Sequence, residues 1–413
     1  SEMCIRDRGN HQRRTHRQCL GRRARRSPDC GRVLTRVTDY RGTTGLAVRG
    51  AAIAEQHERS VMTVSLVRAR EACGALGEGH LPTSSRRISG VIVLLALLVV
   101  VLAASLSFGA NPLPISEIWR VVLSPDSSEA SSIVWTLRVP RTVVGIAAGV
   151  AFGVSGALIQ AITRNPLADP GILGVNAGAG FAIVVGVALF GIGGITGYIW
   201  FSFIGAILAT VLVYLIGSAG RGASSPVTLV LAGIALAAVL SAFSTFLTLM
   251  DQETFRSFRA WGLGSLSRAS LDDTASVAPF LAVGILLAAL ISSSLNAVAL
   301  GDDQATALGA SVTRTRILGI IAVTLLAGGG TALTGGIAFV GLMVPHIVRW
   351  FTGPDQRWII AYTALAAPSI VLIADVLGRV ITRPGEIEAG VLTALIGAPV
   401  LIALVRRRKA SGL

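Results

Sequence analysis

Residues Ile88–Phe108 read ISGVIVLLALLVVVLAASLSF and contain no charged side chain. A helix needs about 20 mainly apolar residues to cross the hydrocarbon core of a bilayer. The basic residues Arg86 and Arg87 directly precede this run, which is too long for a signal peptide and lacks a suitable cleavage site. The stretch is therefore predicted to be a membrane-spanning helix that remains in the protein.

The same apolar pattern recurs along the rest of the chain, interrupted by short polar segments. This repetition predicts an all-α fold, a polytopic membrane bundle of about ten transmembrane helices. The glycine- and proline-rich region around residues 328–345 gives the weakest helical pattern of the set. The nine further spans are predicted at Val143–Ile162, Ile172–Phe190, Tyr198–Ile216, Val227–Leu249, Ala275–Leu295, Arg316–Leu333, Ile337–Trp350, Trp358–Leu377 and Ala389–Val405.

The composition of the whole chain agrees with a membrane protein. Of its 413 residues, 52% are hydrophobic and 14% are charged, whereas soluble globular chains carry about 25% charged residues. The net charge of +14 at pH 7 is unevenly placed, because residues 1–87 hold 18 arginines and 8 acidic residues, or +10, which leaves +4 for the remainder. We therefore expect membrane lipid around the chain and no nucleic-acid partner.

Three segments are predicted from this contrast. Residues 1–87 form a basic extension without helical or strand periodicity, expected to be disordered or partly non-native; residues 88–408 form the transmembrane domain; residues 409–413 form a short cytoplasmic tail. The first eight residues, SEMCIRDR, look like translated sequencing adaptor, and Met62 opens a shorter reading of the chain. We assign no function to residues 1–61, whose cysteine and histidine spacing does not match a zinc site.

Both ends of the transmembrane domain are predicted to be cytoplasmic. Arg86 and Arg87 precede the first span, and a basic cluster at residues 406–409 follows the last one. Basic residues near the ends of spans favour the cytoplasmic side. The rule holds only weakly here, because several arginines fall in the opposite loops, namely Arg120, Arg138, Arg141, Arg256, Arg259, Arg268, Arg379 and Arg383.

The second span carries a helix-packing signal. Gly145, Gly149 and Gly153 recur every fourth residue and so lie on one face of a helix. Small residues let two backbones approach closely in lipid, where no hydrophobic force drives helices together. These glycines are predicted to form a helix–helix contact inside a packed bundle.

Several kinds of chemistry are missing from the sequence. The only lysine is Lys409, so the chain contains no phosphate-binding GxxxxGK[ST] loop, and ATP hydrolysis would require another chain. No nucleophile and base set, metal-ligand set or cofactor motif is found, so we predict neither an enzyme nor a bound cofactor or metal. Asp375 lies inside a predicted span; it is either a functional site such as a proton carrier or an acid bonded to nearby backbone or to Arg379, one helical turn away.

The polar segment LGDDQATALG, residues 300–309, predicts a short helix outside the membrane. Asp302 and Asp303 suit the first turn of a helix, and Gly309 suits its end. Ala305 and Leu308 would share one face. The segment is either a helix that docks into a soluble partner or a plain capped loop, and its spacing alone does not decide between them.

Several longer motifs together resemble one family, the permeases of ATP-driven importers for iron-siderophores, haem and vitamin B12. The resemblance runs from about residue 88 to residue 408. The motifs that carry it are LRVPR (137–141), GALIQ (156–160), RNPLADPG (164–171), WGLGS (261–265), ALGDDQATALG (299–309), GGIAFVGLMVPH (335–346), AD (374–375) and TALIGAP (393–399).

This resemblance implies a function and a set of partners. A bacterial inner-membrane permease of this kind works as a homodimer or as a pair with a paralogue. Two ATP-binding cassette ATPase subunits bind on the cytoplasmic side, and a substrate-binding protein docks outside. Ferric siderophore is the first choice of cargo, while haem and cobalamin remain open. The alternative is an ion-coupled secondary transporter that uses Asp375.

The resemblance also implies roles for individual residues. The short helix at residues 301–309 corresponds to the coupling helix that contacts the ATPase, with Gly301, Asp302, Asp303, Ala305, Leu308 and Gly309 as its residues. Arg138 and Arg379 occupy positions that pair with acids of the binding protein. The cytoplasmic gate would lie at Asn165, Leu167, Ser225 and Val227.

Overall fold

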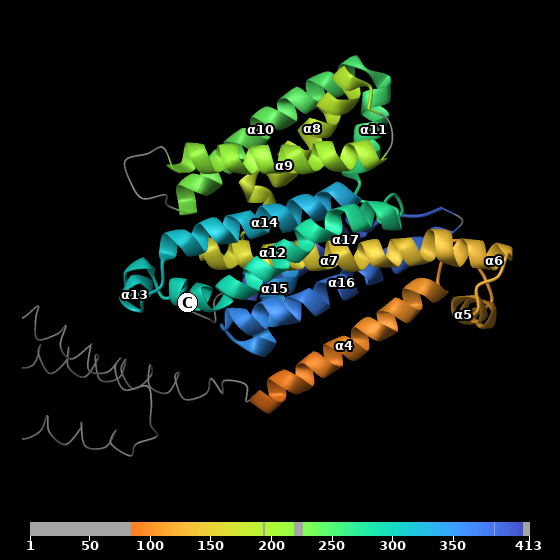
Figure 1. Ribbon diagram of the computed structural model, residues 1–413, viewed down its shortest axis with the longest axis horizontal. Coiled ribbons are helices and arrows are strands. Elements are labelled where there is room, and N and C mark those ends of the chain that lie inside the picture. The colour runs from red at the N-terminus through yellow and green to blue at the C-terminus, as the bar shows by residue number, and fades with distance from the viewer. Residues whose placement is uncertain (1–83, 193–194, 219–225, 384, 408–413) are drawn as a thin grey trace, which may run out of the picture. The chain divides into compact units, whose positions relative to one another are not determined.

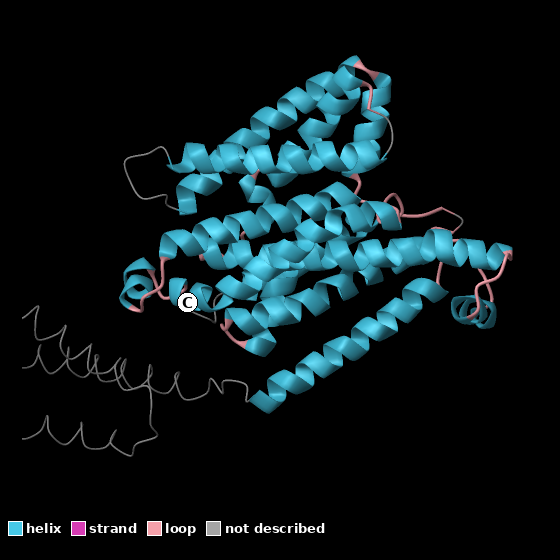
Figure 2. Ribbon diagram, viewed as in Figure 1, coloured by secondary structure: helices cyan, strands magenta, loops and turns pink. Residues whose placement is uncertain are grey.

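Only helices and connecting loops occur in the residues that the computed structural model describes, which are 84–192, 195–218, 226–383 and 385–407 (Figure 2). The predictions for residues 1–83 and 409–413 lie outside these ranges, as does Ser225. The all-α prediction is confirmed for the part of the chain that is described.

Each of the ten predicted spans coincides with a helix in the described residues. Seven of these helices are long and apolar enough to cross a membrane; α8 and α17 contain shorter apolar stretches, and α15 has 13 residues. The ten helices are α4 (Ser84–Ser107), α7 (Val139–Thr163), α8 (Val175–Phe190), α9 (Ile195–Ser218), α10 (Pro226–Met250), α12 (Leu271–Val298), α14 (Val312–Thr334), α15 (Val340–Thr352), α16 (Gln356–Ile381) and α17 (Ala389–Arg407).

Helix α7 lies at the centre of the bundle. It packs against α12, α14, α15 and α16, and its apolar and small residues are buried around most of its circumference. A helix that is apolar all round is stable only when other helices cover it. Figure 1 shows α4 on one side of this central group and the α8, α9 and α10 layer on the other.

The glycine face of α7 lies against α16. An added Cβ atom at Gly145 would overlap the side chain of Leu372, and one at Gly149 would overlap the backbone of Pro368. A Cβ atom at Gly153 would collide with Ala367 in the same way. The two backbones therefore approach more closely than any larger side chain would allow.

Short helices mark the two ends of the bundle. Helix α13 (Asp302–Ala307) lies at one end, while α5 (Ile115–Leu123), α6 (Glu129–Ser132) and α11 (Gln252–Gly262) lie at the other (Figure 1). We refer to these as the α13 end and the α5 end. A six-residue π-helical segment, Ile133–Arg138, joins α6 to α7 at the α5 end.

The contact between α7 and α16 predicts that Gly149→Ala destabilises the protein. The new methyl group meets the Pro368 backbone, which cannot rotate away, so we expect a loss of about 1–3 kcal/mol, as is typical of overpacked cores. Thermal unfolding of the purified protein in detergent measures the change. Gly262→Ala is the matched control, because an added Cβ atom there has no neighbour within 4 Å; equal unfolding temperatures for the two variants would contradict this account.

Candidate functional site

Helix α13 is a short, well-terminated helix at its end of the bundle. Gly301, with φ of 114°, precedes the helix, and the Gly309 backbone has φ of 82°. The Gly309 amide donates to the Thr306 carbonyl at 2.9 Å, and the Ala310 amide donates to the Ala305 carbonyl at 2.9 Å. These two bonds form the usual glycine-terminated helix ending. The predicted helix and its stop at Gly309 are confirmed.

The exposed and buried faces of α13 differ from the prediction. Ala305 is fully buried, whereas the Leu308 side chain is 67% exposed. Asp303 and Gly309 are also exposed. The expectation that Ala305 and Leu308 form one docking face is wrong, because Ala305 packs inward and anchors the helix. Leu308 remains as an exposed apolar side chain that a partner can cover.

The Asp302 carboxylate makes ion pairs. Its Oδ1 atom pairs with Nη2 of Arg164, and both of its oxygens accept from Nη2 of Arg316 at 3.0 Å. Arg164 also donates from Nε to the Val298 carbonyl at 2.9 Å. The expectation that Asp302 caps free helix amides did not include these partners, which lie 138 and 14 residues away in the sequence.

The predicted gate residues lie in two different segments. Asn165 and Leu167 belong to the turn after α7, where the Asn165 side-chain oxygen accepts from the Leu167 amide at 3.0 Å. The short helix Pro170–Leu173 follows, with its first turn capped by Asp169. This short helix contacts α10, the helix that begins at Pro226 and contains Val227. The short helix that follows the first gate segment therefore packs on the helix that holds the second.

At the α5 end, the Arg138 guanidinium closes the end of α4. It donates to the carbonyls of Leu106, Ser107 and Asn111 at 2.7, 2.9 and 2.8 Å. The last carbonyls of a helix have no partner within the helix, and a cation there also meets the negative end of the helix dipole. Arg138 is 3% exposed, and its guanidinium bonds to the end of α4 and to the segment that leads to α5 rather than to solvent.

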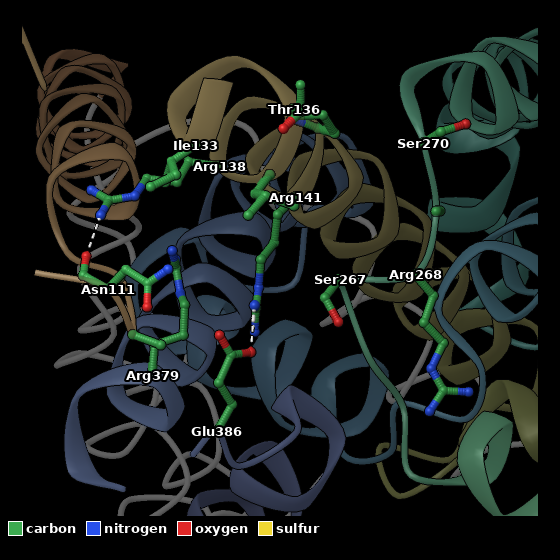
Figure 3. Close-up of a pocket in the computed structure, with 15 residues that line it drawn as sticks. Asn111, Ile133, Thr136, Arg138, Arg141, Ser267, Arg268, Ser270, Arg379 and Glu386 are labelled. Carbon is green, nitrogen blue, oxygen red and sulfur yellow. Dashed lines mark hydrogen bonds and ion pairs between the residues drawn. The ribbon is translucent and has the colours of Figure 1, made fainter. Parts of the chain in front are cut away.

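Four charged residues form a network beside Arg138, in which three side chains are buried and that of Glu386 is partly exposed. Asp375 lies between two arginines, with Nη2 of Arg141 at 2.8 Å and Nη2 of Arg379 at 2.8 Å. Arg141 also pairs with Glu386 at 2.6 Å (Figure 3). The Asp375 side chain is fully buried, and those of Arg141 and Arg379 are nearly so. The predicted pairing of Asp375 with Arg379 is confirmed.

Sequence reasoning missed Arg141 and Glu386 as members of this network. Arg141 stands in the same LRVPR motif as Arg138, so a search for a partner of Asp375 had a candidate there. Nothing in the spacing identifies the pair, because 234 residues separate Arg141 from Asp375. The pairing depends on the close contact between α7 and α16.

The burial of Arg138 and Arg379 corrects the expectation that both offer free charges to a docking protein. Both guanidinium groups bond within the chain, and Arg379 is 2% exposed. They line, with Arg141, Arg268 and Glu386, a cavity of about 330 Å³ (Figure 3). Burial lowers the pKa of the Arg268 guanidinium, which is half-buried. More exposed cations lie nearby on α11, at Arg256 and Arg259.

The site therefore combines a multi-helix bundle, an exposed short helix at one end, and a cation-lined cavity at the other. Among the described residues, no group of three His, Cys, Asp or Glu side chains is placed to hold a metal ion. This arrangement is that of a polytopic helical membrane protein with charged groups at both ends of the bundle.

Comparisons with known proteins agree with this class. Residues 97–407 match the FecCD transport family. The chain is 47% identical over 319 residues to the ferric enterobactin transport system permease of Escherichia coli K12, covering 77% of this chain and 95% of that protein. It is 32% identical to the hemin transport system permease of Yersinia pestis, covering 76% and 95%. The chain belongs to the FecCD transport family and is a permease subunit of an ABC importer.

A solved structure gives the same fold. It is described as an inward-facing conformation of a metal-chelate type ABC transporter, and it aligns with a TM-score of 0.68 at 26% identity. The alignment covers 77% of this chain and 98% of that one. The alternative of an ion-coupled transporter finds no support in the comparisons, and the Asp375 carboxylate lies between Arg141 and Arg379.

The buried network predicts that Asp375→Asn destabilises the fold. Two arginines would lose their shared carboxylate, and a buried unpaired charge costs about 3–5 kcal/mol. Asp126→Asn is the matched control, since the ion pair of Asp126 with Arg120 is exposed and such pairs contribute about 0–1 kcal/mol. Thermal unfolding in detergent compares the two variants. A stable Asp375→Asn protein that fails only in proton-driven uptake would support the proton-carrier alternative instead.

Proposed function

We propose that this chain is the permease subunit of an ATP-driven importer that takes up ferric siderophore or a related metal chelate. It would work as a homodimer or with a paralogous permease, bind two ATPase subunits in the cytoplasm, and receive cargo from an extracytoplasmic binding protein. The observation that carries the proposal is the exposed, well-terminated helix α13 on a bundle that belongs to the FecCD transport family over residues 97–407.

The α13 end is assigned to the cytoplasm. Ten spans place both ends of the transmembrane domain on the same side, and Arg87 and Arg406 lie near those two ends. The ATPase would cover Leu308 and contact Asp303, while Ala305 stays buried against the bundle. This division of roles supports α13 as the coupling helix rather than a plain capped loop, because an anchored helix transmits force and an unanchored one does not.

The α5 end is assigned to the outside, where the binding protein docks. We assign the electrostatic contact with the binding protein to exposed cations instead of Arg138 and Arg379. The guanidinium groups of those two residues are buried and line the cavity. Arg256 and Arg259 on α11 are exposed, and Arg268 is half-buried at the cavity edge. Acidic side chains on the binding protein would pair with them and orient the encounter.

The gate is assigned to the turn that holds Asn165 and Leu167, together with the start of α10 at Val227. The same assignment includes Ser225, which precedes α10. Contact between the short helix Pro170–Leu173 and α10 supports coordinated movement of the two segments. ATP-driven closure of the ATPase pair would shift the bundle between outward-open and inward-open states.

Ferric siderophore is the favoured cargo on the basis of the relatives. Curated relatives include permeases for ferric enterobactin, for siderophores, for iron(III) citrate and for hemin. The relative with 47% identity is a ferric enterobactin permease, whereas the hemin permease shares 32%. Haem therefore stands as a second candidate, distinguished by the same uptake assay.

Reconstituted transport tests the proposal. In liposomes that contain the permease, its ATPase and a loaded binding protein, we expect ATP-dependent uptake of radiolabelled ferric enterobactin. Leu308→Asp should reduce uptake by at least about tenfold, because a charge replaces the apolar contact with the ATPase. Leu123→Asp is the control, since Leu123 is 80% exposed at the opposite end. Uptake that a proton gradient drives without the ATPase would refute the importer mechanism.

The docking assignment has its own test. We expect Arg256→Glu combined with Arg259→Glu to slow association of the binding protein by about tenfold at low salt, since rim charges mainly set the encounter rate. The difference should shrink as salt rises and screens the charges. Arg357→Glu, at the α13 end, is the control. Stopped-flow or biosensor kinetics measure the rates; identical rates for all three proteins would remove α11 from the docking surface.

A further inference from the structure

The Asp302 carboxylate makes ion pairs at a place where four helix ends lie close together. Asp302 is the first residue of α13, and Arg164, the residue directly after α7, pairs with it. Arg316 reaches it from the first turns of α14, with both carboxylate oxygens at 3.0 Å. Arg164 also bonds the Val298 carbonyl at the end of α12. Asp302 is thus connected directly to α7 and α14, and through Arg164 to α12.

The backbone of Arg164 supports a specific role for this contact. Arg164 has φ of 51°, and within the described residues only one other non-glycine residue, Phe339, has a positive φ. Glycine or asparagine normally occupies such a helix-ending position, because a larger side chain is strained there. An arginine at this position instead places its guanidinium between Val298 and Asp302.

The contact continues from Arg164 into the proposed gate. The Asn165 amide, next in the chain, donates to the Gln160 carbonyl at 3.2 Å, which fixes the turn onto the end of α7. The same turn leads to the short helix Pro170–Leu173, which contacts α10. A displacement of Asp302 would therefore reach the turn of Asn165 and Leu167 and, through the short helix, α10.

Two of the three side chains in this ion-pair cluster are partly exposed. Those of Asp302 and Arg164 are 46% and 36% exposed, and water screens such pairs so that they contribute little to folding; the Arg316 side chain is 14% exposed, so its pair with Asp302 contributes more. Ala305, fully buried, already anchors α13 to the bundle. The ion pairs of Asp302 are better suited to fixing the orientation of α13 relative to the neighbouring helices than to stabilising the fold.

We propose that Asp302 is the positioning residue that converts movement of α13 into movement of the end of α7 and the start of α14. The proposal rests on the proposed function, in which an ATPase displaces α13. Leu308 would be the contact with the ATPase, and Asp302 would pass the displacement inward without touching the ATPase. Removing the Asp302 charge should then separate ATPase binding from transport.

The first experiment measures that separation with Asp302→Asn in the complete complex. We expect the ATPase to co-purify, and the ratio of its activity with and without the loaded binding protein to fall about tenfold, within the range typical of coupling between linked sites. Asp126→Asn removes an exposed carboxylate paired with Arg120 at the opposite end and should leave stimulation unchanged. Loss of ATPase binding, or equal stimulation in all three complexes, would overturn the proposal.

A comparison of the single variants with the triple variant tests the pairing itself. If Asp302 acts through Arg164 and Arg316, then Asp302→Asn combined with Arg164→Gln and Arg316→Gln should be no worse than Asp302→Asn alone. Additive losses would show that the three residues act separately and would contradict the proposed role of the Asp302 ion pairs.

A second experiment does not depend on the ATPase. A nitroxide label on Leu308→Cys, in a chain whose four native cysteines are changed to serine, reports the motion of α13 by electron paramagnetic resonance. We expect Asp302→Asn to increase label mobility in a protein that still unfolds cooperatively, because Ala305 stays buried and only the ion pairs of Asp302 are lost. Unchanged mobility would refute the role of these ion pairs in holding α13. If the wild-type permease binds no ATPase, the proposed function fails, while increased mobility in Asp302→Asn still supports that structural role.

Discussion

The close contact between α7 and α16 is the constraint on which the rest of the molecule depends. Three glycines of α7 lie where α16 leaves no room for a side chain, as Gly149 shows against the backbone of Pro368. Lipid supplies no hydrophobic force between helices, so packing and internal polar bonds must hold them. The same contact brings Arg141 beside Asp375 and places α7 among the helices that position both ends of the bundle.

The two ends use ion pairs in opposite ways. At the α5 end, Asp375 and its arginines are excluded from water, where an unpaired charge is very costly, so the network is a fixed part of the frame. At the α13 end, Asp302 and Arg164 are partly exposed, and water can replace each partner at small cost. The ion pairs of Asp302 can therefore break and re-form during a transport cycle, while breaking the Asp375 network costs much more free energy.

The sequence predicted the helices better than it predicted the side-chain contacts. Apolar length is a property of each segment alone, so a helix at each of the ten predicted positions, the helix at residues 302–307 and its stop at Gly309 were predicted without a structure. The pairing of Asp375 with Arg379 was also found, because both residues lie on one helix. The partners Arg141 and Arg164 were missed, since each lies more than a hundred residues from the acid that it binds.

Burial explains the errors in the expected contact surfaces. The family resemblance implied that Arg138 and Arg379 pair with acids of a binding protein, yet each guanidinium bonds to carbonyls or a carboxylate of its own chain. Ala305 was expected beside Leu308 on an exposed face, but the small alanine is the residue that fits against the bundle. Helical spacing gives the angle of a side chain around its own axis, and only the neighbouring helices determine which angle faces solvent.

In the proposed mechanism, the distribution of charge would let a nearly uncharged bundle respond to a soluble ATPase. Its apolar interior is close-packed and resists gradual deformation, so force applied at α13 must pass through contacts at the helix ends. The Asp302 cluster provides such contacts to α7, α12 and α14 at once, and the glycine contact with α16 keeps α7 from bending locally. Movement at one end is then expressed as a shift of whole helices, which is what opening a path through a membrane requires.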